Sequence, residues 1–413
     1  MEGSKTNKEH RTFLQLQHWS AIKDLKLAEK LVLPLCQESS LFAYLYLKTK
    51  KMYHHFPQRK NGENPFLHPL NVVLNLRKAK ISDPVTLCAG LIHDIIEETV
   101  DSYKKREKIK DQKKDIIKLD AYAEHIFKEL HKELVIFCTN KKINLKKAEE
   151  IISTTRFLTR HKSDVYYTSI NNIFKAPLNL AQKRAIQVKL ADRIHNILCI
   201  EGFKEEERVF QCFKNLFILN RTKQYLMQKE IDENKNEVQL LFKKCGKATY
   251  DAFLTICNGA EERGMKNVKS MLQLAFKKYA LEKARTFEVF PSNKNETHLM
   301  LLYQNIIYKY DLRLHHKWNR FEEVKKEEKI FCERFFKEFI FSQKQIQAII
   351  DYKDAYALKE VMTYLMYLPN YTLKGFQAQE SFGEKKIVMR KWYNSFSKSK
   401  AQSPQLISLL SWL

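Results

Sequence analysis

The spacing of apolar residues is the feature that most constrains the fold of this 413-residue chain. Apolar residues recur every three or four positions in segments such as VTLCAGLIHDIIEE, AEHIFKELHKELVIF and AIQVKLADRIHNILCI. This spacing gathers apolar side chains on one face of an α-helix. Few segments show the polar and apolar alternation, rich in Val, Ile and Thr, that is typical of strands. The sequence therefore predicts an all-α protein.

Loop signals divide the predicted helices into regions. Four segments have the composition of loops, charged connections or linkers: 57–66, 101–115, 230–237 and 290–297. We predict a helical lead-in over residues 1–30 and a helical domain over 31–245, with a charged insertion at about 101–150. A further helical region of unknown role follows over 246–413.

The chain is strongly basic. It carries 73 Lys and Arg residues against 48 Asp and Glu residues, which gives a formal net charge of +25. Such a field attracts polyanions, including nucleotides, nucleic acid and anionic membrane surfaces. The excess is spread along the chain, however, and Lys-rich and Asn-rich usage also follows from the base composition of a genome. Charge alone leaves both explanations open.

Cysteine usage and hydropathy indicate the compartment. No run of eighteen apolar residues is present, and the polar start MEGSKTNKEHRTF lacks the apolar core of a signal peptide. The eight cysteines are scattered, without a C-x-x-C pair, and mostly lie in apolar surroundings, as reduced and buried thiols do. We therefore expect a soluble cytoplasmic protein that has no membrane contact.

The stretch LIHDIIEETV, residues 91–100, places polar groups in an apolar run. Asp83-Pro84 is a favourable helix start, because Asp caps free amides and Pro suits the first helical position. On a helix that continues from there, His93, Asp94 and Glu97 share an edge. A His-Asp pair alone is more often structural than catalytic, so its meaning depends on whether further ligands lie elsewhere.

Two such residues are present at a distance in the sequence. His68 precedes Pro69 and a new apolar helix, and Asp192 lies within another, with Lys189 and Asn196 on the same face. A buried aspartate without partners is costly, and a divalent ion held by two imidazoles and two carboxylates removes that cost. We therefore predict a metal site. His195 is expected to face away from Asp192 and to be structural.

The order His, His-Asp, Asp resembles the HD phosphohydrolase superfamily. RKNGENPFLHPLNVV, TLCAGLIHDIIEET and VKLADRIHNI are each similar to a motif of the (p)ppGpp hydrolase domains of RelA/SpoT-type enzymes and small alarmone hydrolases. The resemblance covers roughly residues 40–225 and implies an HD-domain helical bundle over the predicted 31–245 domain.

The resemblance also implies an activity and residue roles. The activity is hydrolysis of the 3′-pyrophosphate of ppGpp or pppGpp, which gives GDP or GTP and pyrophosphate. One divalent ion, in this family usually manganese, would be held by His68, His93, Asp94 and Asp192. The catalytic pair would be Glu97 and Glu98, which position or activate the attacking water. The assigned substrate-binding residues are Arg59, Lys60, Lys189 and Asn196.

Departures from the family pattern leave the substrate open. Glu98 replaces the usual Asp, the Pro and aromatic residues of the 57–66 loop are displaced by one position, and apolar residues follow Asn196. These changes affect the pocket more than the metal ligands. The alternative is therefore an HD phosphohydrolase that acts on another nucleotide or phosphorylated small molecule, such as NADPH.

The C-terminal region shows no match to the alarmone synthetase domain, so we expect degradation of the nucleotide and not its synthesis. Aromatic residues alternate with basic ones in MRKWYNSFSKSK, residues 389–400. This pattern suits an RNA contact, and it suits a basic tail equally. A third interpretation is a non-enzymatic module that binds nucleic acid. The oligomeric state stays open.

Overall fold

The computed structural model describes residues 20–59, 62–109, 113–164, 166–203, 205–228, 235–260, 342–344 and 362–372. Within these ranges the regular elements are helices and no residue lies in a strand, which confirms the all-α prediction. None of the described helices is long and apolar enough to cross a lipid bilayer. The segment 389–400, predicted to suit an RNA contact, lies outside the described residues.

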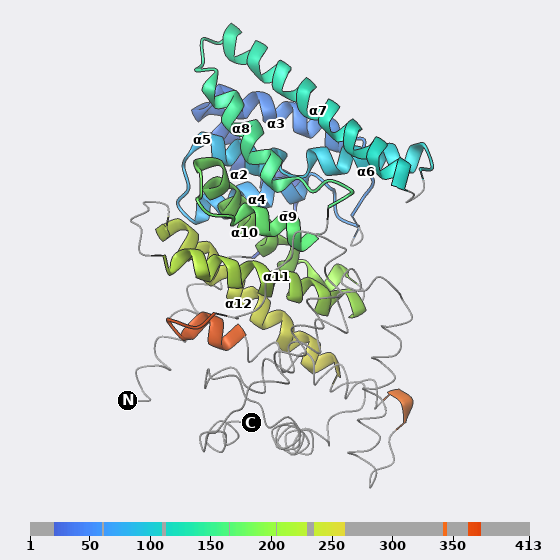
Figure 1. Ribbon diagram of the computed structural model, residues 1–413, viewed down its shortest axis with the longest axis vertical. Coiled ribbons are helices and arrows are strands. Elements are labelled where there is room, and N and C mark those ends of the chain that lie inside the picture. Colours follow the sequence, from blue (N-terminus) through green and yellow to red (C-terminus); the bar gives the residue numbers. More distant parts are fainter. Residues whose placement is uncertain are drawn as a thin grey trace. The chain divides into compact units, whose positions relative to one another are not determined.

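The chain divides into two compact units. The first draws on residues 1–204 and 217–248, and the second on 205–216 and 249–413. The helices of the first unit, drawn in Figure 1, are α2 (Leu25–Glu38), α3 (Ser40–Tyr53), α4 (Leu67–Lys78), α5 (Pro84–Ile92), α6 (Ile95–Arg106), α7 (Lys113–Asn140), α8 (Lys146–Leu158), α9 (Tyr166–Ile173) and α10 (Leu180–Leu198), followed by the short 3₁₀ helix η1 (Ile200–Gly202). Two further helices contribute residues to both units: α11 (Glu205–Leu226) and α12 (Lys235–Ala260). The boundary expected near residue 245 stays a prediction.

Three helices form the centre of the first unit. Every residue from Leu67 to Leu76 of α4 and from Val85 to Ile92 of α5 is buried, as are most residues of α10. A helix that is buried on all sides must be surrounded by other helices. α10 packs against α4, α5, α8 and α9, and Figure 1 shows it (green) among them.

The start of α5 follows the sequence prediction. The Asp83 carboxylate accepts hydrogen bonds from the backbone N–H groups of Val85 and Thr86, and Pro84 occupies the first turn. Arg184 of α10 donates to the same carboxylate at 2.7 Å and to Glu150 of α8 at 3.0 Å. The cap therefore also ties α5 to two neighbouring helices.

The prediction of one continuous helix through LIHDIIEETV is wrong. α5 ends at Ile92, and α6 begins at Ile95. Between them, His93 is the C-cap of α5, and Asp94, with φ −100° and ψ −6°, is the N-cap of α6. Since the three- and four-residue apolar spacing continues on both sides, periodicity gave no sign of the break. The break falls at the His-Asp pair.

The predicted charged insertion is mainly helical. Residues 101–106 extend α6, and the 28-residue helix α7 packs against α6 and α8. The charged connection expected over 101–115 is therefore shorter than predicted, because its two ends belong to these helices.

Candidate metal centre and active site

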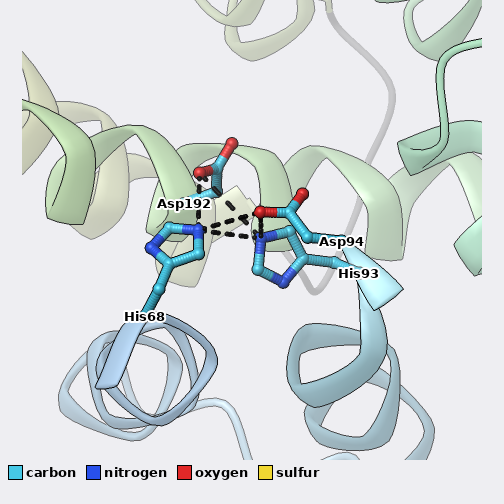
Figure 2. A group of neighbouring side chains, drawn as sticks. All are labelled: His68, His93, Asp94 and Asp192. Carbon is cyan, nitrogen blue, oxygen red and sulfur yellow. Dashed lines mark hydrogen bonds and ion pairs between the residues drawn. The ribbon is translucent and has the colours of Figure 1, made fainter. Parts of the chain in front are cut away.

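The four predicted ligands come together in the first unit (Figure 2). His68 lies in the first turn of α4, His93 and Asp94 lie at the break between α5 and α6, and Asp192 lies within α10. One potential ligand atom from each residue lies within 4.8 Å of the other three. His68, His93 and Asp192 are 2%, 1% and 3% exposed, so the cluster is sunk between the three central helices.

The distances within the cluster are short. Nε2 of His68 lies 3.2 Å from Oδ2 of Asp94, 3.3 Å from Oδ1 of Asp192 and 3.1 Å from Nε2 of His93. Nε2 of His93 lies 3.1 Å from the same Asp94 oxygen. Two imidazole nitrogens and two carboxylate oxygens therefore face one point.

The chemistry of these atoms fits a cation. Nδ1 of His93 lies 2.8 Å from the carbonyl oxygen of Gly90, which can only accept, so this nitrogen donates. In neutral His93 the lone pair is therefore on Nε2 and points at the carboxylate oxygens. Acceptors that converge in a buried site require a positive charge between them. A mixed set of imidazole and carboxylate ligands suits a divalent metal ion.

The electrostatics agree with this interpretation. Burial alone would raise the pKa of Asp94, but the positive charge of His93 and hydrogen bonds from both histidines hold that pKa well below its usual value. Burial alone would lower the pKa of His93, yet the Asp94 carboxylate raises it. Both pKa shifts come from the attraction between the Asp94 carboxylate and the imidazoles, and the two carboxylates together favour positive charge at His93.

Asp192 is held by the other residues of its helix face. Lys189 forms an ion pair with Oδ2 of Asp192 at 3.0 Å, and Nδ2 of Asn196 donates to Oδ1. This confirms the predicted shared face. Burial alone would raise the pKa of Asp192, but the charge of Lys189 and a hydrogen bond from His68 together lower it. Lys189 thus contacts a predicted ligand, and its assignment to substrate binding stays a prediction.

The 57–66 loop reaches the same face of α10. Nη2 of Arg59 donates to Oδ1 of Asn196 at 3.1 Å, so these two predicted substrate-binding residues lie side by side. The backbone N–H of Gly62 donates to the carbonyl oxygen of Arg59. Gly62 has a φ of +77°, which glycine adopts without strain. Lys60 lies outside the described residues.

The predicted acid pair lies in the first turn of α6. Oε1 of Glu97 accepts a hydrogen bond of 2.7 Å from the backbone N–H of Arg160, in the loop between α8 and α9. Burial and the charge of Asp94 raise the pKa of Glu97, and the same two causes raise the pKa of Glu98 to about 7. Two half-buried carboxyl groups with raised pKa values therefore lie beside Asp94, and Glu98 is the one whose pKa is near neutral.

Sequence reasoning missed the position of His195. Its Nδ1 lies 2.8 Å from Nδ1 of His68, on the side of that ring opposite to the cluster. The available signal was its spacing of three residues from Asp192, which puts the two side chains on adjacent lines of one helix. The contact itself depends on how α4 packs against α10.

Comparisons with curated proteins give four relatives, all named as guanosine-3′,5′-bis(diphosphate) 3′-pyrophosphohydrolases or probable ones. A probable enzyme of Mycoplasma genitalium is 35% identical over 159 residues, which are 38% of this chain and 18% of the relative. Its counterpart in Mycoplasma pneumoniae is 32% identical over 162 residues, or 39% of this chain and 18% of the relative. A protein of Spiroplasma citri is 22% identical over 254 residues, or 61% and 29%.

These matches span less than a third of each relative. No family model matches the chain, and no solved structure matches it. The resemblance to the guanosine-bis(diphosphate) pyrophosphohydrolases, predicted from three short motifs, is nevertheless confirmed by the four curated relatives that carry that name.

Proposed function

We propose that this protein is a metal-dependent hydrolase that removes the 3′-pyrophosphate from ppGpp and pppGpp. The observation that carries the proposal is the convergence of His68, His93, Asp94 and Asp192, each with a ligand atom within 4.8 Å of the others. The proposed substrate class comes from the names of the relatives, and this chain matches only 18% of the length of each of the first two. The geometry supports a phosphohydrolase, and the names support a guanosine substrate.

The proposed cofactor is Mn²⁺, held by the four clustered side chains. When bound, a divalent ion supplies Lewis acidity toward a phosphoryl oxygen and lowers the pKa of water. The protein contributes the arrangement of the site. Lys189 and Asn196 hold both oxygens of Asp192, and the Gly90 carbonyl orients His93 so that its Nε2 faces the cluster.

Glu97 and Glu98 are the proposed proton carriers. The hydrogen bond from Arg160 fixes one oxygen of Glu97, so that the other oxygen is held in a defined position. Glu98 has a pKa of about 7, which allows it to accept and release a proton at neutral pH. Glu97 is therefore proposed to orient the attacking water and accept its proton, with Glu98 as the second acid/base group.

Arg59, Lys60 and Asn196 are the proposed contacts to the nucleotide. Arg59 offers several N–H donors in a plane, which suits phosphate oxygens and also stacking on a flat base. Its contact with Asn196 places this cation beside the metal ligands, where it can offset phosphate charge. The half-buried Lys189 is ion-paired with Asp192, so its proposed contribution to substrate binding is indirect.

The test is product release from a panel of substrates in the presence of Mn²⁺. The panel contains ppGpp, pppGpp, NADPH and the common nucleoside triphosphates, and a His93→Ala, Asp94→Ala double variant is measured beside the wild type. We expect GDP and pyrophosphate from ppGpp with the wild type and none with the variant. Variant-sensitive activity on another substrate alone would replace the proposed substrate and keep the chemistry. No turnover by metal-loaded protein would overturn the proposed function.

A further inference from the structure

A second group of potential ligands lies behind His68. A carboxylate oxygen of Glu63, a ring nitrogen of His195 and the sulfur of Cys199 lie within 4.8 Å of one another. His195 is 1% exposed, and its Nδ1 lies 2.8 Å from Nδ1 of His68. Its Nε2 faces Cys199, with a distance of 3.7 Å to Sγ. His195 therefore either binds a second ion or supports His68.

The position of one proton decides between these roles. Two ring nitrogens 2.8 Å apart form a hydrogen bond only if one carries the proton and the other accepts it. If His68 binds an ion through Nε2, the neutral ring carries its proton on Nδ1. Nδ1 of His195 must then be the acceptor, and the proton of neutral His195 is on Nε2.

This arrangement excludes a second ion on His195. A nitrogen that carries a proton cannot be a metal ligand, so Nε2 of His195 is unavailable while His68 binds the first ion. The reverse arrangement would free Nε2 of His195, but it would put a proton on Nε2 of His68 and remove that ligand. Cys199 is instead placed to accept the Nε2 proton of His195, and a carboxylate oxygen of Glu63 lies within 4.8 Å of the same group of atoms.

The two predicted imidazole ligands then have matching supports. Nδ1 of His93 donates to the Gly90 carbonyl, and Nδ1 of His68 donates to His195, both at 2.8 Å. Metal-binding histidines usually donate their second ring N–H to an acceptor, which fixes the tautomer and the ring orientation. His93 is supported by the backbone, whereas His68 depends on a side chain that can be replaced.

We infer that His195 is a positioning residue of the metal site, whose Nδ1 accepts the proton of His68 and keeps Nε2 of His68 directed at the ion. This inference rests on the metal site of the proposed function. It extends the support of that site to Glu63, which lies on the same loop as Arg59.

Calorimetric titration of Mn²⁺ into metal-free protein tests the inference without substrate. His195→Leu removes the acceptor at similar bulk, and His195→Asn keeps an oxygen near the position of Nδ1. We expect the Leu variant to bind Mn²⁺ about 10- to 100-fold more weakly than the wild type, and the Asn variant to stay within a few-fold of it. His131→Leu, on α7, is the matched control because that helix carries no proposed site residue.

A second measurement uses the wild-type chain, so it does not depend on how a variant folds. With diamagnetic Zn²⁺ bound, nitrogen NMR of ¹⁵N-labelled histidines should show His68 protonated on Nδ1 and His195 on Nε2. Calorimetry should give one ion per chain. A proton on Nδ1 of His195, or two bound ions, would overturn the inference.

The outcomes separate the inference from the proposed function. If the wild type binds no Mn²⁺, the proposed metal site itself fails. If the wild type binds one ion and His195→Leu binds it equally well, the positioning role fails and the metal site stands. The same holds if His195→Asn loses as much Mn²⁺ affinity as His195→Leu.

Discussion

The two sides of the proposed site are built differently. The metal cluster takes His68, His93 and Asp192 from the central helices, where each is nearly inaccessible to solvent. The nucleotide side takes half-buried Arg59 from the loop before α4. The cluster is fixed by the packing that folds the domain, whereas the nucleotide side is fixed by a few hydrogen bonds such as that between Arg59 and Asn196.

This difference separates chemistry from specificity. Changes in the buried cluster should affect metal binding and turnover together. Changes on the nucleotide side should affect substrate binding and leave the metal in place. The departures from the family pattern fall mainly on the nucleotide side, so they bear on substrate identity more than on metal binding.

The largest effect is expected from Asp94→Asn. This change keeps the size of the side chain and removes the charge that two histidines contact. Replacing a residue that only supports a metal ligand costs up to roughly 100-fold in metal affinity. Since Asp94 is itself a proposed ligand, we expect a larger loss of Mn²⁺ affinity and a turnover at background level. Calorimetry and pyrophosphate release measure the two effects. Asp251→Asn, exposed on α12, should change neither, and Mn²⁺ binding at wild-type affinity by Asp94→Asn would remove Asp94 from the ligand set.

Glu97→Gln should separate turnover from metal binding. The amide oxygen of Gln can still accept the hydrogen bond from Arg160, but it cannot take a proton. We expect turnover to fall by roughly 10²- to 10⁴-fold, with Mn²⁺ affinity within a few-fold of the wild type. Glu124→Gln on α7 is the control. A parallel loss of metal affinity would show that Glu97 belongs to the cluster.

Arg59→Ala should affect the nucleotide side alone. Loss of a charged hydrogen-bond donor to phosphate should raise the KM for ppGpp by roughly 10- to 100-fold, with unchanged Mn²⁺ affinity. Arg156→Ala is the matched control, since that arginine pairs with Glu124 on the surface. An unchanged KM would place the nucleotide elsewhere.

The smallest effects come from two glycines, one on each side. A Cβ at Gly90 would lie 2.7 Å from Cδ1 of buried Leu76, so Gly90→Ala should lower the free energy of unfolding by about 1–3 kcal/mol. A Cβ at Gly62 meets nothing within 4 Å, but the φ of +77° costs about 1–2 kcal/mol locally. Urea unfolding measures the effect of Gly90→Ala, and the KM for ppGpp measures the effect of Gly62→Ala. A changed KM with Gly90→Ala and a lowered stability with Gly62→Ala would contradict the division of the site into a metal side and a nucleotide side.

Local rules in the sequence were sufficient for several parts of the structure. Asp83-Pro84 predicted the start of α5 because a cap needs only neighbouring residues. The face shared by Lys189 and Asp192 followed from helical spacing. The all-α class followed from the same periodicity along the chain.

Other parts depend on contacts that spacing cannot encode. The break at Asp94 is invisible to periodicity because apolar residues continue in register on both sides of it. The contact between His68 and His195 joins residues 127 positions apart and requires the packing of α4 on α10. The meeting of the four ligands was predicted from the cost of a buried aspartate together with a family motif, since spacing within single helices says nothing about how separate helices meet.

The break between α5 and α6 also limits how this site could be transplanted. On a continuous helix, the side chains of adjacent residues leave the axis about 100° apart, which works against turning a His-Asp pair toward one ion. Here Nε2 of His93 and Oδ2 of Asp94 lie 3.1 Å apart, at the point where α5 ends and α6 begins. A protein engineer who grafts the four ligands onto a helical scaffold should therefore copy the interruption between α5 and α6 together with the side chains.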